Sequence, residues 1–202
     1  MKKSRTSLFA ILAVVAVAAL AVGSRLAVWS GGEHSAQASI GGPFTLVDGD
    51  NRTVTDQDFR GKWMLIYFGY TFCPDVCPTS LTTVAGALDR LEPAQVDKVV
   101  PILISVDPAR DTPAVMKDYV AAFHPKMVGL TGNPQQVAAA MKAYKVYAAR
   151  AKAPNGQNDD ETYTVDHSSI LYLVGPDGAF VAHFPHGTTA EDLAAALKKR
   201  LE

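Results

Sequence analysis

The chain has 202 residues, 48% of them hydrophobic, and its formal net charge is -1. This length and composition are enough for one domain with a sizeable buried core. The near-neutral charge disfavours a nucleic-acid partner, because nucleic-acid-binding domains usually carry an excess of basic residues. Four basic residues lie among the first 26, which leaves the remainder with 15 basic and 20 acidic residues, a charge of -5. The sequence therefore predicts a mildly acidic domain after a short basic and apolar start.

The first 29 residues are predicted to be a membrane anchor or a signal segment. Lys2, Lys3 and Arg5 precede Leu8–Val22, an apolar run of 15 residues without a charge. A helix that spans a membrane needs about 20 apolar residues. The anchor interpretation therefore extends the run to Trp29, which would lie at the membrane interface. We favour this anchor over a cleaved signal.

Two further features set the start of the folded part. Ala36-Gln37-Ala38 is a pattern that a signal peptidase could cut, which keeps the cleaved alternative open. Residues 30–42 are rich in Gly, Ser and Ala and have no hydrophobic period, so we predict a flexible tether there. Under either interpretation the basic end stays on the cytoplasmic side of the membrane. Residues 43–202 then lie on an extracytoplasmic face, such as the periplasm, with the anchor in the inner membrane.

Residues 43–202 alternate predicted strands and helices. The strands are expected at Phe44–Val47, Trp63–Tyr70, Val99–Val106, Met127–Leu130, Ile170–Val174 and Ala179–Phe184. The helices are expected at Pro78–Leu91, Pro113–Phe123, Pro134–Tyr144 and Thr189–Leu201, with a surface loop at Ala151–Glu161. This order predicts an α/β domain with a central mixed sheet flanked by helices. The thioredoxin-like fold has the same order, with a reactive cysteine motif after the first central strand.

Cys73-Pro74-Asp75-Val76-Cys77-Pro78 is the most informative stretch of the sequence. Proline disfavours the helical conformation of the residue before it, so we expect neither cysteine to lie inside a regular helix. Pro78 suits the first turn of a helix, which would leave Cys77 near the N-cap. The helix dipole there is expected to lower the pKa of the thiol and to favour the thiolate.

Two thiols at this spacing leave several alternatives open. An exported domain with a single cysteine pair usually forms a structural disulfide. The pair could also bind a soft metal ion, copper(I) or zinc, or help to hold an iron–sulfur cluster. Structural zinc normally has four protein ligands and an iron–sulfur cluster four cysteines, whereas this chain has two cysteines. A site with two cysteines and one histidine remains, and copper suits it well.

His167 is the candidate third ligand. It lies just before the predicted strand Ile170–Val174, where Asp166 or Ser168 could orient its ring. The other histidines are interpreted as surface or structural residues: His34 in the tether, His124 at a helix end, and His183 and His186 beside the last strand. From the residues alone, His167 is either a structural histidine or a metal ligand.

Three motifs together resemble those of the Sco/SenC family. They are Cys73–Pro78, then Ser105–Pro108 with Arg110–Pro113, and then Asp166–Ser169. The resemblance covers the chain from about Pro43 to the C-terminus and includes the apolar N-terminal segment. It implies a thioredoxin-like, membrane-tethered copper protein whose ligands are Cys73, Cys77 and His167.

The resemblance also implies a role in the assembly of cytochrome c oxidase, chiefly of the copper A centre on subunit II. We therefore expect a metallochaperone that holds one copper ion, as Cu(I) or Cu(II). It would receive the ion from an upstream donor and deliver it to subunit II or a similar recipient. Asp75 is expected to give at most a weak oxygen contact or an acidic docking surface. The loop Asp107–Pro113 is expected to be structural or to take part in docking.

The alternative hypothesis is enzymatic. Cys73 and Cys77 could form a redox-active pair that reduces disulfides in an oxidase subunit or in another exported protein. Three residues separate the two cysteines here, whereas thioredoxin motifs have two, and the wider loop argues against ordinary thioredoxin chemistry. The two functions are compatible, because reduced recipient cysteines are ready to bind metal.

Overall fold

In the computed structural model, which describes residues 40–151 and 163–201, seven strands form a central sheet. In spatial order these are β2 (Thr53–Thr55), β1 (Thr45–Asp48), β5 (Val128–Thr131), β4 (Val99–Ser105), β3 (Trp63–Gly69), β8 (Ile170–Val174) and β9 (Phe180–Pro185). The strands β3, β4 and β5 are parallel, and the strands that extend the sheet on either side run antiparallel to their neighbours. The sheet is therefore mixed, as predicted.

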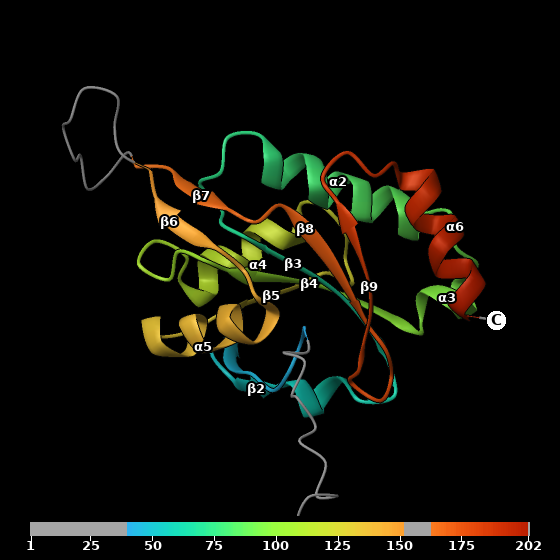
Figure 1. The fold of residues 1–202 in the computed structure, drawn as a ribbon, viewed down its shortest axis with the longest axis horizontal. Coiled ribbons are helices and arrows are strands. Elements are labelled where there is room, and N and C mark those ends of the chain that lie inside the picture. The colour runs from blue at the N-terminus through green and yellow to red at the C-terminus, as the bar shows by residue number, and fades with distance from the viewer. Residues whose placement is uncertain (1–39, 152–162, 202) are drawn as a thin grey trace, which may run out of the picture. The chain divides into compact units, whose positions relative to one another are not determined.

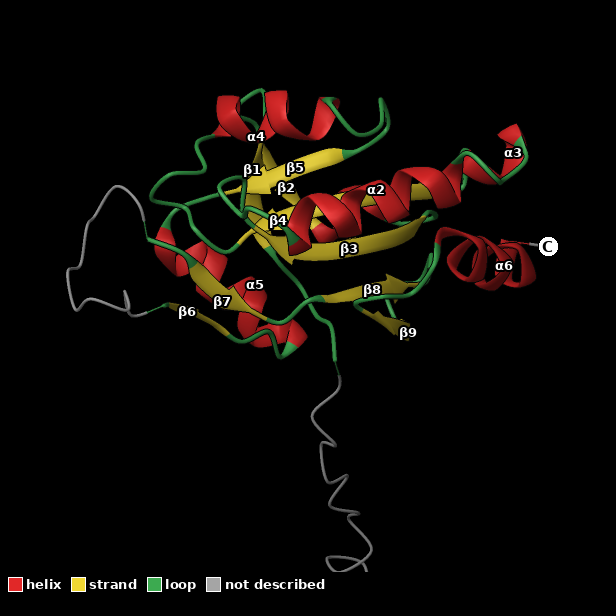
Figure 2. Ribbon diagram, turned by 90° about the horizontal axis from the view of Figure 1, so that it is seen from above, coloured by secondary structure: helices red, strands yellow, loops and turns green. Residues whose placement is uncertain are grey.

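Helices cover both faces of this sheet. They are α2 (Val76–Leu88), α3 (Pro93–Val96), α4 (Pro113–Ala121), α5 (Pro134–Tyr144) and α6 (Ala190–Leu201), and η1 (Asp56–Phe59) is a short 3-10 helix. Figure 2 shows α2 and α4 on one side of the strands and α5 on the other. The helix α6 packs beside α2 (Figure 1). This arrangement confirms the predicted thioredoxin-like fold, a mixed sheet flanked by helices.

The central strand β3 is buried on both faces because it lies between two strands and two helix layers. Successive side chains of a strand point to opposite faces. Phe68 therefore packs toward α5, where its ring centroid lies 5.4 Å from that of Tyr144. Tyr67 and Gly69 face the opposite layer, where α2 begins. The cysteine motif follows directly at the carboxyl end of β3.

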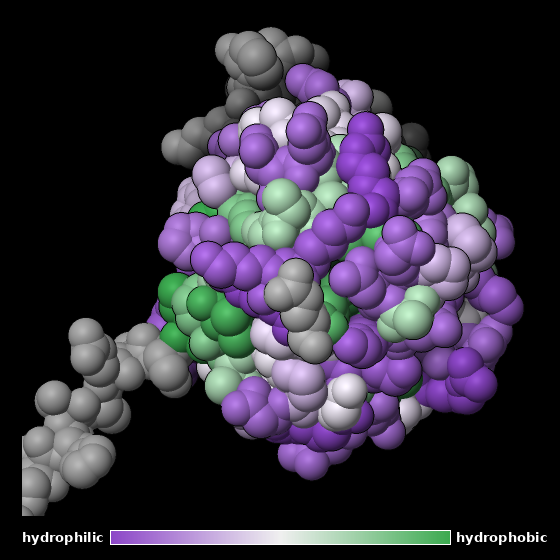
Figure 3. Space-filling model, turned by 90° about the vertical axis from the view of Figure 1, so that its right-hand side faces the viewer, coloured by the Kyte–Doolittle hydropathy of each residue, from purple (hydrophilic) through white to green (hydrophobic). Residues whose placement is uncertain are grey.

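The last helix is amphipathic, and this explains how it closes the domain. Its buried residues are Leu193, Ala194, Leu197 and Leu201. Acidic residues lie in its first turn and basic residues in its last, which suits the helix dipole. Figure 3 shows the side of the molecule on the right of Figure 1, where hydrophilic residues cover most of the surface.

Most predicted elements are confirmed to within two residues, and α5 and β8 match their predicted bounds. The helix α4 has a capped start, since the Thr112 side chain accepts from the Val115 N–H and Pro113 is the first helical residue. The sequence did not predict β2, η1, α3 or the small second sheet of β6 (Ala148–Arg150) and β7 (Val165–His167). These elements have only three or four residues, too few for a hydrophobic period to show.

The start of α2 is a correction. The helix begins at Val76 and ends at Leu88, whereas Pro78–Leu91 was predicted. Cys77 therefore lies in the first helical turn, although Cys73 lies outside the helix as expected. The restriction before a proline is a bias that packing can overcome. The first turn of a helix also tolerates the missing N–H of Pro78.

Several predictions concern residues outside the described part of the chain. The anchor or signal at residues 1–29, His34 and most of the predicted loop 151–161 fall among them. The last residues assigned to the tether are described, and the Gly41 N–H donates to the Ala143 carbonyl at 3.0 Å. Within residues 40–151 and 163–201, no helix is both long and apolar enough to cross a bilayer.

Asp111 ties the loop after β4 to the segment that leads to Cys73. One carboxylate oxygen accepts from the Thr71 hydroxyl at 2.6 Å, and the other accepts from the Ser105 hydroxyl at 2.6 Å. The Thr71 N–H also points at both oxygens, at 3.3 Å. Burial raises the pKa of this carboxyl group. The contacts agree with the structural role expected for the Asp107–Pro113 loop.

We predict that Asp111→Ala destabilises the domain by about 2–3 kcal/mol, because it leaves buried donors of Thr71 and Ser105 without an acceptor. Urea unfolding should show a lower midpoint with an unchanged slope. The control is Asp118→Ala, which removes an exposed carboxylate from α4 and should change stability by less than about 0.5 kcal/mol. Equal midpoints for the two variants would refute the structural role of Asp111.

Candidate metal site

Cys73, Cys77 and His167 meet at the carboxyl end of β3. Their ligand atoms, two Sγ and one imidazole nitrogen, all lie within 4.8 Å of one another. Cys77 Sγ is 3.3 Å from His167 Nε2, although the two residues are 90 positions apart in the sequence. The Cys77 N–H points at Cys73 Sγ from 3.4 Å. The fold thus brings together the three residues that the sequence analysis named.

The lack of a side chain at Gly69 makes room for Cys77. A Cβ atom at Gly69 would lie 2.8 Å from Cys77 Sγ and 2.9 Å from the ring atom Cε1 of Tyr67. Such distances are too short for real atoms, so any larger residue would displace the sulfur or the ring. The first turn of α2 can approach the end of β3 closely only because residue 69 has no side chain.

Two tyrosines hold His167 in place. The Tyr70 hydroxyl accepts from the Val165 N–H at 3.1 Å and so ties β7 to the end of β3. The rings of Tyr67 and Tyr70 meet the His167 ring edge to face, with centroid distances of 6.0 and 5.8 Å. Pairing of β7 with β6 places His167 opposite Ala148. The imidazole therefore has a defined position at the end of β7, a short strand that the sequence did not predict.

The tautomer of His167 follows from its partners. Nδ1 lies 3.3 Å from the Ser168 carbonyl oxygen, which can only accept a hydrogen bond. Nδ1 therefore carries the proton, and the lone pair of Nε2 faces Cys77 Sγ. Burial also lowers the pKa of His167, which keeps the ring neutral near pH 7. A neutral imidazole with its second nitrogen fixed by a carbonyl is the form that binds metals.

The expected low pKa of Cys77 is wrong. Cys77 is 0% exposed, and this burial raises the pKa of its thiol well above the usual range. The cost of placing a charge in this interior outweighs the favourable dipole at the start of α2. Without a positive partner the thiol stays protonated. The site is built for a thiolate that forms together with a bound cation.

Both cysteines are free in the structure, and their surroundings fit a soft metal. For metal bonds of about 2.0–2.3 Å, two ligand atoms at 120° would lie about 3.5–4 Å apart. The three atoms here are within 4.8 Å of one another, so they need to move by about 1 Å at most. Two sulfurs and one imidazole nitrogen are soft ligands, which favour copper(I) or zinc over magnesium or calcium. Three protein ligands also leave a coordination position open.

The other candidate residues do not join this cluster. Asp75 is the N-cap residue of α2 and is exposed, and its carboxylate lies 3.4 Å from the Thr79 hydroxyl. His124 Nδ1 accepts from the Lys126 N–H, and His183 stacks on Phe180. Among the described residues the cluster does not include Asp75, for which at most a weak oxygen contact was expected, and an acidic docking role for it stays a prediction.

The residues that support the ligands, chiefly Tyr67, Gly69 and Tyr70, were not predicted from the sequence. A signal was present, because residues 67 and 69 lie two apart on a strand and must face the same side. Which side that is, and what covers it, became visible only in the fold. His186, interpreted as a surface residue, is exposed, yet its Nδ1 lies 3.5 Å from the buried Ser80 hydroxyl.

Comparisons with known proteins agree with this geometry. The family model for SCO1/SenC matches residues 32–202. The protein SCO1 homolog 1 of Arabidopsis thaliana, a mitochondrial protein, is 38% identical over 170 residues, which cover 84% of this chain and 49% of that protein. An SCO2-like protein of Rickettsia prowazekii is 42% identical over 159 residues, covering 79% of this chain and 76% of that protein. The chain thus spans about half the length of the Arabidopsis relative.

Comparison with solved structures also finds similarity to Sco proteins. Copper-bound ScoI of Bradyrhizobium japonicum is 46% identical, with a TM-score of 0.69, over 80% of this chain and 99% of that one. Copper-bound ScoI of Arabidopsis thaliana is 38% identical, with a TM-score of 0.71, over 80% of this chain and 98% of that one. BsSco, described as having a disulfide switch and as a member of a family of cytochrome c oxidase assembly proteins, is 27% identical, with a TM-score of 0.60, over 81% and 94%. The chain belongs to the SCO1/SenC family.

Proposed function

We propose that this protein is a copper metallochaperone that holds one copper ion on Cys73, Cys77 and His167 and delivers it during the assembly of cytochrome c oxidase. The observation that carries the proposal is the convergence of two thiols and one neutral imidazole within 4.8 Å. Copper bound to the related ScoI structures supports the choice of metal. The description of BsSco supports the choice of process.

The ligand set suits both oxidation states of copper. Thiolates favour copper(I), and the imidazole of His167 also favours copper(II). Binding displaces the proton of the buried Cys77 thiol, because the cation compensates the charge that burial otherwise penalises. Copper supplies no reaction step here, since it is the cargo that the protein carries.

The exposure of the three ligands suggests the order in which they would release the ion. Cys77 is 0% exposed and Cys73 is 7% exposed, and His167 is only partly buried. A thiolate of the recipient can therefore approach over Cys73 and His167 and take the open coordination position. Exchange would begin at these two ligands, and Cys77 would release the ion last. The ion passes through a shared complex and is never free in solution.

Two exposed aromatic residues flank this approach. Phe72, next to Cys73, is 54% exposed, and Tyr147 is 63% exposed. The Tyr147 backbone pairs with Ser168, the neighbour of His167, through two hydrogen bonds of 3.0 Å. The Arg110 guanidinium lies 4.6 Å from the centre of the Phe72 ring. Aromatic residues and arginine often supply the binding energy of protein interfaces, so we assign docking of the recipient to this rim.

We further propose that the recipient is subunit II of the oxidase, at its copper A centre, and that an upstream carrier supplies the ion. The N-terminal segment would hold the domain at the membrane, facing the periplasm or another extracytoplasmic space. The family supports this assignment, and so does the apolar run Leu8–Val22 with its basic start.

A thiol–disulfide reductase is the second candidate function. It is favoured by two free cysteines whose backbone and sulfur atoms already touch, with Cys77 N to Cys73 Sγ at 3.4 Å. The disulfide switch named for BsSco supports the same chemistry. In that reaction Cys73, the more exposed thiol, would attack the disulfide of the partner. Cys77 would then resolve the mixed disulfide, and two electrons would pass to the partner.

The full chain, purified in detergent and reduced, should bind one copper ion per molecule. Cys73→Ser and Cys77→Ser should each abolish tight binding, because each removes one of two soft ligands. His167→Ala should weaken mainly copper(II), and the control His183→Ala removes an exposed histidine of β9 and should change nothing. Metal analysis of each variant after dialysis against a chelator measures how much copper stays bound. An unchanged copper content in either cysteine variant would contradict the proposal.

Phe72→Ala and Tyr147→Ala should slow copper transfer to a soluble subunit II domain by roughly tenfold each, since truncating an interface anchor costs about 1–2 kcal/mol. Copper content should stay at one per chain. The matched control is Val181→Ala, an apolar residue 42% exposed on β9. Transfer followed by copper A absorption would measure the rates, and equal rates in all three variants would rule out this rim as the docking surface.

The two candidate functions separate in one assay. Metal-free reduced protein is mixed with the oxidised subunit II domain, and the thiols of both proteins are counted over time. A carrier without reductase activity leaves the recipient disulfide intact, and its copper-loaded form transfers copper only to a chemically reduced recipient. Rapid loss of thiols from Cys73 and Cys77, with matching gain in the recipient, would favour the reductase.

A further inference from the structure

Tyr67 is a buried polar residue at the site that the ligand set does not use. Its side chain is only 1% exposed. Its hydroxyl makes no hydrogen bond of standard geometry with any residue in the described part of the chain. A buried hydroxyl without a partner is costly, so it usually has a partner in some functional state of the protein.

The ring of Tyr67 lies close to two of the three ligands, Cys77 and His167. Its Cε1 atom and Cys77 Sγ both lie within 3 Å of the space that a Gly69 side chain would fill. Its centroid lies 6.0 Å from that of His167, nearly perpendicular to it. Tyr67 therefore lies beside the buried sulfur of Cys77 and the ring of His167.

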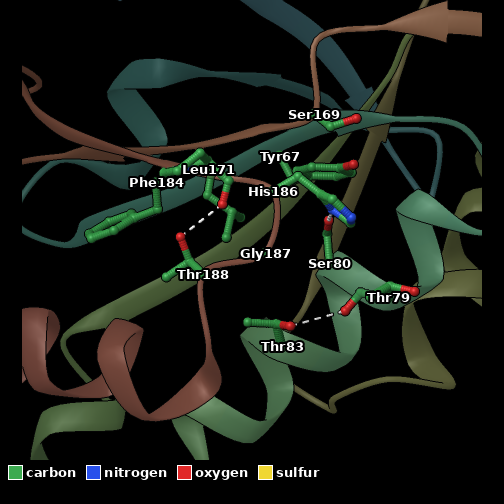
Figure 4. Close-up of a pocket in the computed structure, with 11 residues that line it drawn as sticks. Tyr67, Thr79, Ser80, Thr83, Ser169, Leu171, Phe184, His186, Gly187 and Thr188 are labelled. Atoms are coloured by element: carbon green, nitrogen blue, oxygen red, sulfur yellow. Dashed lines mark hydrogen bonds between the residues drawn. The ribbon is translucent and has the colours of Figure 1, made fainter.

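The other side of Tyr67 opens on a small cavity of about 210 Å³. Figure 4 shows its hydroxyl at one end of this cavity with Ser80, Ser169 and His186 around it. Ser80 lies one helical turn after Cys77 on α2, and its hydroxyl is 3.5 Å from His186 Nδ1. The Tyr67 hydroxyl thus shares this cavity with the hydroxyl groups of Ser80 and Ser169.

We propose that Tyr67 is a positioning residue for the bound copper, whose hydroxyl donates a hydrogen bond to the Cys77 thiolate and accepts one from Ser80 or Ser169. This inference rests on the proposed copper site and deepens it. A phenol can donate one hydrogen bond and accept another at the same time, and so can a serine hydroxyl. The chain of donors therefore runs from the cavity through Tyr67 to the sulfur.

Burial raises the pKa of Tyr67, so the phenol keeps its proton and can donate a hydrogen bond.

The hydrogen bond would change the relative stability of the two oxidation states of the bound copper. A hydrogen bond to a ligating sulfur withdraws electron density from it and weakens its donation to the metal. Copper(II) depends on that donation more than copper(I) does, so the hydrogen bond raises the reduction potential. Tyr67 would thus favour copper(I), the state that thiolates of a recipient bind best.

Tyr67→Phe in the full chain tests the proposal, because it removes one oxygen atom and keeps the ring. We expect the affinity ratio of copper(I) to copper(II) to fall roughly tenfold, which is the scale of one hydrogen bond and corresponds to about 59 mV for a one-electron couple. The sulfur-to-copper(II) charge-transfer absorption should move to lower energy. The control is Tyr172→Phe, which removes the hydroxyl of a tyrosine on β8 that is 3% exposed and packs against Phe68 and Tyr144.

Each outcome decides something. A lower potential and a red-shifted band in Tyr67→Phe alone support the hydrogen bond. A potential that stays the same or rises, with copper still bound at one per chain, overturns the role of Tyr67 and leaves the copper site intact. Equal shifts in both variants overturn it too, because they indicate a general effect of losing a tyrosine hydroxyl. Loss of copper from the wild-type chain would instead defeat the proposed function itself.

Discussion

The candidate site depends on the contact between Cys77 and the bare Cα atom of Gly69. A Cβ there would be 2.8 Å from the sulfur, so the absence of a side chain lets α2 begin directly over the end of β3. This contact buries the Cys77 thiol completely and raises its pKa. A group of this kind is stable as a thiol, or as a thiolate beside a cation, and unstable as a free thiolate. The contact therefore couples the ionisation of Cys77 to the arrival of a metal.

The three ligands divide into a fixed one and two more accessible ones. Cys77 is part of a helix, whereas Cys73 lies in the loop before it and His167 ends a three-residue strand. Tyr70 and Asp111 hold the accessible pair indirectly, the first through Val165 and the second through Thr71. Such a site can retain an ion and still offer an edge for ligand exchange. That combination suits a carrier better than a store.

Much of the fold could be predicted because long elements have a clear hydrophobic pattern. The buried strand at Trp63 and the helix at Pro134 are both of this kind. The β6–β7 ribbon could not be found, since three residues carry no period. The cysteine motif was visible as chemistry, but the high pKa of Cys77 was not, because burial depends on Gly69 and the helix above it. His167 needed family resemblance, since only the folded chain brings it within 3.3 Å of Cys77.

The most direct test of this account is X-ray absorption spectroscopy at the copper edge on the copper-loaded full chain. A site formed by Cys73, Cys77 and His167 predicts two sulfur ligands in both oxidation states and imidazole scattering that is clearest for copper(II). A wild-type spectrum with one sulfur or none, or with no imidazole in either oxidation state, would contradict the proposed coordination.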